Sequence, residues 1–138
     1  MIRPVVGTQG DRELYLLDTN DGMRPQRLTR DDHDDFAPAI SPDGKQIAWV
    51  SDRSGFKHIW LMTDRGDGFV GRERRATDLT NQRLTAGNHS QEPAWFPDGV
   101  RLAFQSNDLD SPDIWSIDVG DRLSRTPWTA DRIQDFQP

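Results

Sequence analysis

The sequence predicts an all-β repeat protein, and two observations lead to that prediction. Residues 38–62 contain a Ser-Pro-Asp-Gly turn and two short runs of β-branched and aromatic residues, and the same unit recurs without a gap at 93–117. Residues 2–17 match the second half of the unit. Repeats of this length are typical of solenoids, propellers and arrays.

Composition agrees with a turn-rich β protein and excludes several classes. The 138 residues include 11 Gly, 9 Pro and no Cys, so neither a disulfide framework nor a thiolate metal site is expected. A net charge of -6 opposes nucleic-acid binding. No apolar run near Met1 is long enough for a signal peptide or a membrane span, which predicts a cytoplasmic protein, or a mature or excised piece.

The first unit is expected to be incomplete. Strands are predicted at 2–6 and 13–18 around a turn at 9–11, with a third at 27–29 after the Asn-Asp-Gly turn at 20–22. No segment of this unit corresponds to the strand at 36–40, with which the second unit begins. Residues 1–30 are therefore predicted to form a partial blade.

The second unit, residues 36–85, should have four strands. Its turn at 41–44 suits a tight reversal, because Pro42 presets φ, Asp43 can bond its own backbone and Gly44 tolerates positive φ. The runs at 47–50 and 59–62 do not alternate cleanly, which indicates a sheet buried on both faces. An insertion within 69–81 precedes the Leu-Thr pair at 84–85.

The third unit, residues 91–129, repeats this plan and ends on Trp128-Thr129 in place of Leu-Thr. Residues 133–138 contain the start of a further first strand, since Asp-Phe-Gln-Pro at 135–138 repeats Asp-Phe-Ala-Pro at 35–38. The aromatic positions of all units should fill the space between sheets rather than form a site. They are Tyr15, Trp49, Trp60, Trp95, Phe104 and Trp115.

The Pro-Ala-aromatic-Ser-Pro-Asp-Gly turn, the Ile-Trp pairs at 59–60 and 114–115 and the Leu-Thr pairs recur together. In this combination the chain resembles the repeats of TolB-type β-propellers, relatives of the WD-repeat blade, over nearly its whole length. Two positions depart from that pattern. Ile40 stands where an aromatic residue is usual, and Phe96 stands where the turn has serine.

The resemblance implies a ring of four-stranded antiparallel blades around a channel, often with about six blades. About three blades fit into residues 1–138, so we expect a single partial β-propeller domain. The implied function is a non-catalytic module for protein binding, periplasmic as in TolB-like relatives. Because both ends of a half-ring would expose apolar blade faces and strand edges, we expect the chain to self-associate, with a two-chain ring as the leading arrangement. Two alternatives stay open: the propeller of a prolyl-oligopeptidase-like peptidase separated from its catalytic domain, and a metal-dependent channel enzyme.

The predicted loops at the two ends of the blades differ in charge. The loops that enter each first strand are rich in carboxylates, and they should converge at the mouth of the channel and attract a basic peptide or a divalent cation. The residues expected there are Asp34, Asp35, Ser90, Glu92 and Asp135. The insertion offers an alternative, basic binding segment with Arg72, Arg74 and Arg75.

Catalytic motifs are lacking in the sequence. It contains no Gly-x-Ser-x-Gly elbow, no Gly-rich phosphate loop and no His-Glu-x-x-His, and no organic cofactor is expected. His33, His58 and His89 are predicted to lie in loops. For a divalent cation the weak candidates are Asp31, Asp32 and Asp34, although their spacing lacks the glycine of an EF-hand loop.

Overall fold

The computed structural model describes residues 2–6, 12–20, 24–64, 66, 68–69, 73–74, 90–107, 112–120 and 125–129. These residues form strands β1 (Ile2–Val6), β2 (Leu14–Asp18), β3 (Pro25–Arg27), β4 (Asp35–Ile40), β5 (Gln46–Ser51), β6 (His58–Thr63), β7 (Glu73–Arg74), β8 (Ser90–Trp95), β9 (Arg101–Ser106), β10 (Asp113–Asp118) and β11 (Arg125–Pro127). None of them belongs to a helix long and apolar enough to cross a membrane.

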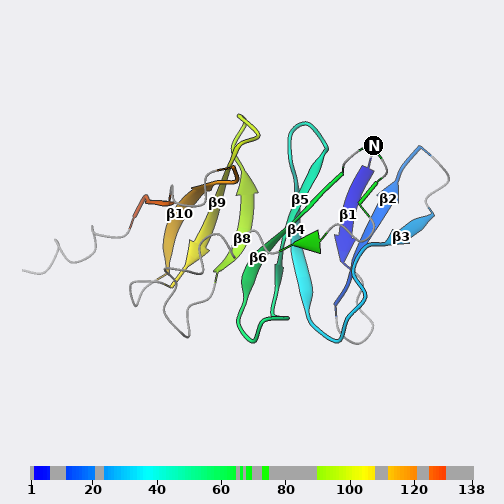
Figure 1. Cartoon of the computed structure of the whole chain (residues 1–138), viewed down its shortest axis with the longest axis horizontal. Coiled ribbons are helices and arrows are strands. Elements are labelled where there is room, and N and C mark those ends of the chain that lie inside the picture. Colours follow the sequence, from blue (N-terminus) through cyan, green and yellow to red (C-terminus); the bar gives the residue numbers. More distant parts are fainter. Residues whose placement is uncertain are drawn as a thin grey trace, which may run out of the picture.

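The strands form three antiparallel sheets, which we call blade 1 (β1–β3), blade 2 (β4–β7) and blade 3 (β8–β11). Blade 1 has three strands and the other two blades have four, with neighbours in the sheet following the chain order. Blade 2 lies between the other two (Figure 1). The predicted all-β class is confirmed, and a partial propeller accounts for this arrangement of sheets.

Two strands differ from their predicted positions. In blade 1, β3 is Pro25–Arg27 instead of 27–29, because the Thr29 side chain takes over the pairing: its Oγ1 accepts the Leu14 N–H at 2.9 Å. In blade 2, β7 lies inside the predicted insertion, where Arg74 pairs with Leu61 of β6. Part of the insertion thus belongs to the sheet. The Leu-Thr pair at 84–85 lies outside the described residues.

The predicted turn at 41–44 is confirmed. The Gly44 N–H donates to the Ser41 carbonyl at 2.9 Å, and Gly44 has φ of 73°. Asp43 fixes the turn through its Oδ1, which accepts the Ser41 hydroxyl at 2.6 Å and the Lys45 N–H at 3.0 Å. In blade 3, Phe96 replaces the serine, yet the backbone bond from Gly99 to the Phe96 carbonyl is kept at 3.0 Å.

The first strand of each four-stranded blade carries a bulge at the same repeat position. Ala37 has φ of 51° and Glu92 has φ of 55°, and the register shifts beside both residues. A left-handed conformation costs a residue with a side chain about 1 to 2 kcal/mol. Because both blades adopt this conformation at equivalent positions despite its cost, the bulge is part of the structure of the repeat.

The core lies between the blades. Between blades 1 and 2 it comprises Leu14, Leu28, Ile47, Trp49, Met62 and Phe69, and between blades 2 and 3 it comprises Ala48, Ile59, Leu61, Leu102, Phe104 and Ile117. Successive residues of β5 enter opposite clusters, which confirms that blade 2 is buried on both faces. The predicted aromatic core is confirmed for Trp49 and Phe104, which are buried, and Trp60, Trp95 and Trp115 pack against the clusters.

Candidate functional site

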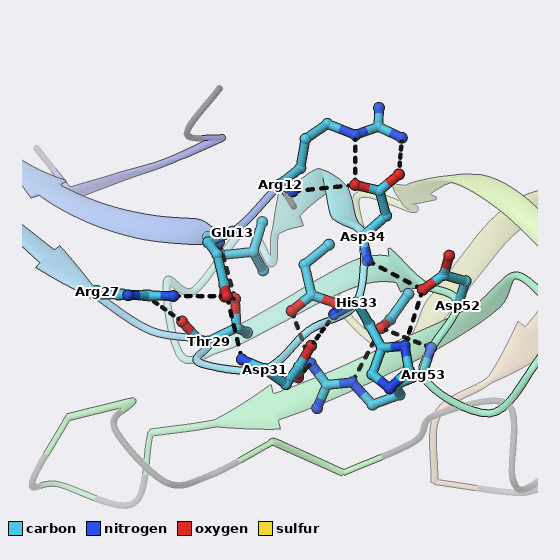
Figure 2. A network of polar contacts seen from close by, with 12 residues as sticks. Arg12, Glu13, Arg27, Thr29, Asp31, His33, Asp34, Asp52 and Arg53 are labelled. Carbon is cyan, nitrogen blue, oxygen red and sulfur yellow. Dashed lines mark hydrogen bonds and ion pairs between the residues drawn. The ribbon is translucent and has the colours of Figure 1, made fainter. Parts of the chain in front are cut away.

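Charged side chains from two loops gather at one end of blades 1 and 2 (Figure 2). The loop before β4 and the loop after β5 are joined by a hydrogen bond from the Asp34 N–H to Asp52 Oδ1 at 3.0 Å. His33 Nδ1 lies 3.5 Å from the same carboxylate oxygen. This contact places the two loops at the same end of the blades.

Arg12 and Asp34 form the most regular ion pair of this end. Arg12 Nε and its backbone N–H donate to Asp34 Oδ1 at 3.2 and 3.0 Å, and Arg12 Nη2 donates to Oδ2 at 2.9 Å. The hydrogen bonds from the guanidinium, and after them the bond from the backbone N–H, lower the pKa of Asp34 from 3.8 to about 2. The guanidinium also lies 4.1 Å from the Phe36 ring centre. Asp34 is therefore ionised and held in place at neutral pH.

Arg53 connects two carboxylates to the aromatic core. Its Nη2 lies 2.7 Å from Asp35 Oδ2 and 2.9 Å from Asp31 Oδ2, and its guanidinium carbon lies 4.6 Å from the Trp60 ring centre. Burial raises the pKa of Asp35, which is fully buried, and the charge of Arg53 opposes that rise. A buried carboxylate needs such a partner to stay ionised.

A third polar contact explains the Leu-Thr signature of the repeat. Thr29 Oγ1 accepts the Leu14 N–H and donates to Glu13 Oε2 at 2.7 Å, while Arg27 Nη2 donates to Glu13 Oε1 at 2.7 Å. In blade 3, Thr129 repeats the pattern, accepting the Ile114 N–H at 2.9 Å and donating to Asp113 at 3.2 Å. The threonine thus fastens the outermost strand to its neighbour, which is a structural role.

The predicted channel-mouth residues differ in accessibility. Asp34 is half-buried and paired, whereas Asp35 and Ser90 have no exposed surface and Glu92 is exposed at the bulge of β8. Ser90 also donates its N–H to the Lys57 carbonyl at 2.8 Å, which ties blade 3 to the loop of blade 2. Asp135 lies outside the described residues, as do Arg72 and Arg75 of the alternative segment, and Arg74 belongs to β7. A binding role for these residues stays a prediction.

The three weak candidates for a divalent cation site differ in their surroundings. Asp31 pairs with Arg53 and Asp34 with Arg12, while Asp32 is exposed. Within the described ranges no group of three or more His, Asp or Glu residues is arranged to hold a metal ion. Binding of a divalent cation stays a prediction for the chain.

One histidine was placed wrongly by the sequence. His58 is the first residue of β6 and is 5% exposed, because it continues the pairing of β5 and β6 opposite Ser51. His33 lies in the exposed loop before β4, as expected. His89 falls outside the described residues.

Sequence reasoning missed the arginines at this end. Arg12, Arg27 and Arg53 lie among the carboxylates and pair with Asp34, Glu13, Asp31 and Asp35. The expected acidic end is therefore substantially neutralised around blades 1 and 2. A partial signal was available: Arg12 comes directly before the predicted strand at 13–18 and Arg53 lies in the loop after the predicted run at 47–50, where a long side chain can reach the next loop.

Three antiparallel sheets that pack face to face through buried aromatic residues define a β-propeller repeat protein. Two solved TolB structures have this fold: one from Agrobacterium tumefaciens has a TM-score of 0.69 at 21% identity, covering 91% of this chain and 44% of that one. The other, from Acinetobacter baumannii, has a TM-score of 0.68 at 23% identity, covering 91% of this chain and 29% of that one.

Sequence relatives identify the family. The Tol-Pal system protein TolB of Anaeromyxobacter sp. is 42% identical over 132 residues, covering 94% of this chain, and the TolB homolog of Chlorobium luteolum is 32% identical over 153 residues, covering 88%. The chain is a TolB-type β-propeller repeat protein. It spans 27% and 35% of the lengths of those two relatives. No protein-family model matches it.

Proposed function

We propose that this chain is a non-catalytic protein-binding module that works in a Tol-Pal type system, and therefore in the periplasm. The observation that carries the proposal is the 42% identity, over nearly the whole chain, to a Tol-Pal system protein TolB. Arg12, Arg27 and Arg53 support it, because their ion pairs hold loops and strands of the described residues together. Loops held rigidly on a β scaffold are suited to binding another protein.

The partner class we propose is a basic peptide segment that contacts the loops before β4 and after β5 and the bulge of β8. Asp32 is exposed before β4 and Glu92 is exposed at the bulge, and the Asp34 and Asp52 side chains are 37% and 43% exposed. Carboxylates at a rim speed association with cationic partners and make it depend on salt. The buried Asp35 contributes to the rigidity of the surface and not to contact.

The test is a calorimetric titration of the wild-type chain with a Lys/Arg-rich peptide and, as control ligand, a Glu/Asp-rich peptide of equal length. The double variant Asp32→Asn/Glu92→Gln should weaken binding of the basic peptide several-fold and flatten its dependence on salt. Asp98→Asn is the matched control, since Asp98 is exposed in the β8–β9 turn and pairs with Arg101. Loss of binding in the control alone, or tighter binding of the acidic peptide, would contradict the proposal.

We also propose that the module self-associates, with a closed two-chain ring as the arrangement. One face of blade 3 supports this, because Ile114 and Trp128 are 43% and 53% exposed there, whereas both faces of blade 2 are covered. Uncovered apolar residues on a sheet favour association. Light scattering should show a mass that rises toward twice the chain mass of 15.8 kDa with concentration. A constant monomer mass at high micromolar concentration would contradict self-association.

A further inference from the structure

Two serines form a pair of buried hydroxyls at one end of blade 3. Ser90 begins β8 and Ser106 ends β9, and the two residues lie directly opposite each other in the register. Neither has any exposed surface. Side chains alternate along a strand, so Ser106 lies on the same side of β9 as Phe104, which packs in the cluster between blades 2 and 3. The pair is therefore enclosed in the contact between these two blades.

The hydroxyl oxygens of the pair have no hydrogen-bond partner within the part of the chain that the structure describes. A serine hydroxyl can donate one hydrogen bond and accept two. Leaving such a group buried without a partner is costly, and buried polar groups of folded proteins are bonded either to protein or to ordered water. The backbone of Ser90 is fixed, because its N–H donates to the Lys57 carbonyl at 2.8 Å. The two side chains are thus held in place and still need a partner.

The same positions of the repeat in blade 2 are bridged by a side chain. Asp35 and Ser51 lie opposite each other across β4 and β5, as Ser90 and Ser106 do across β8 and β9. Arg53 Nε donates to Ser51 Oγ at 3.0 Å, and Arg53 Nη2 donates to Asp35 Oδ2 at 2.7 Å. One guanidinium therefore supplies hydrogen bonds to both members of the buried pair.

Blade 3 differs from blade 2 in the residues that make this bridge. The repeat sets Ser90 where blade 2 has Asp35, and it sets Asp108 where blade 2 has Arg53. Asp108 lies outside the described residues, but an ionised carboxylate has no hydrogen to donate. Serine is also shorter than aspartate, so Ser90 extends less far toward its opposite residue. The substitutions remove the bridging donor and shorten one of its acceptors together.

We propose that an internal water molecule binds between Ser90 and Ser106 and takes the bridging role that Arg53 has in blade 2. Opposite residues of an antiparallel pair have Cβ atoms about 4.5 to 5.5 Å apart, and a water with two bonds of about 2.8 Å spans hydroxyls that do not bond directly. The water accepts a hydrogen bond from one hydroxyl and donates one to the other. Both serines then have a partner.

The chemistry of the pair selects a neutral ligand of the size of water. Both side chains are uncharged and fully buried, and burial of an ion beside them would need an opposite charge. Two hydroxyls meet the minimum of about two polar partners that internal waters have in folded proteins. The bound water fastens the start of β8 to the end of β9, close to the bulge that presents Glu92.

Magnetic relaxation dispersion of the water nuclei counts the water molecules that stay inside a protein, and it tests the proposal in solution. The variant Ser90→Ala/Ser106→Ala should hold one such water fewer than the wild type, because a site lined by methyl groups stays dry. Ser51→Ala is the matched control from blade 2, and it should lose none, since Arg53 bonds that hydroxyl directly. Circular dichroism shows whether each variant is folded.

A high-resolution crystal structure of the wild-type chain tests the same site without any substitution. It should show a water within hydrogen-bond distance of both Ser90 Oγ and Ser106 Oγ. An unchanged number of internal waters in the folded double variant would overturn the proposal. A crystal structure in which the two hydroxyls bond each other, or in which a side chain occupies the place between them, would overturn it as well.

Discussion

At the scale of single residues, Arg53 favours the ionised form of the buried Asp35. The guanidinium is 13% exposed and lies 2.7 Å from a carboxylate with no exposed surface. Arg53→Met should therefore destabilise the fold by about 3 to 5 kcal/mol at neutral pH, the typical cost of removing one partner of a buried pair. Urea unfolding measures this loss, and Arg101→Met, at an exposed pair, should cost much less.

The loss caused by Arg53→Met should depend on pH. The pKa of Asp35 is already raised by burial, and removal of the cation raises it further. A raised pKa in the folded state contributes stability at low pH that disappears as pH rises through that pKa. The difference between variant and wild type should thus be smallest in acid and grow toward neutrality. A difference that is constant from pH 4 to 7 would show that Asp35 is not the group left unpaired.

Asp34 should have the opposite pH dependence. Its pKa is lowered from 3.8 to about 2, so its pairing with Arg12 contributes stability above the ordinary pKa and loses it as pH falls toward 2. The wild type should lose more stability than Asp34→Asn between pH 4 and pH 2. Parallel pH profiles of the two proteins in urea unfolding would contradict this role of the ion pair.

Thr29 and Thr129 make the same bonds in different surroundings. The bond from the Leu14 N–H to Thr29 is buried, whereas that from the Ile114 N–H to Thr129 is exposed. Thr29→Val should cost about 1 to 3 kcal/mol because buried groups lose their partner, and Thr129→Val should cost less because water replaces the hydroxyl. Equal losses in thermal unfolding of the two variants would contradict this account of the Leu-Thr pair.

At the scale of elements, the turn between β4 and β5 needs a left-handed backbone at Gly44 in addition to the side-chain bonds of Asp43. A side chain at Gly44 would meet no atom within 4 Å, but φ is +73° there. Gly44→Val should destabilise the chain by about 1 to 3 kcal/mol, because a β-branched residue is strained in this region. Gly120→Ala is the control, since Gly120 does not require positive φ. An unchanged melting temperature for Gly44→Val would contradict the assignment.

The sequence indicates elements whose causes are local and misses those whose causes are distant. The turn at 41–44, strands β4, β5 and β6 of blade 2 and the buried aromatic residues follow from composition and repetition. The ion pairs do not, because Arg12 and Asp34 are 22 residues apart and their contact depends on how blade 1 docks on blade 2. The bulges at Ala37 and Glu92 could not be predicted from the sequence either, since neither residue type favours positive φ.

At the scale of the whole molecule, stability comes from faces of neighbouring blades. Blade 2 is covered on both sides, and the face of blade 3 turned away from blade 2 carries Trp128 and Ile114, which are exposed. A sheet that buries apolar residues on one side only gains less from burial than one covered on both. The proposed self-association should cover this face and stabilise blade 3, so the melting temperature should rise with protein concentration.

The most direct test of this account is small-angle X-ray scattering of the wild-type chain over a concentration series. A closed two-chain ring predicts a mass approaching twice 15.8 kDa together with a compact, ring-like scattering profile. A mass that remains 15.8 kDa, or a dimer with an extended profile, would contradict it.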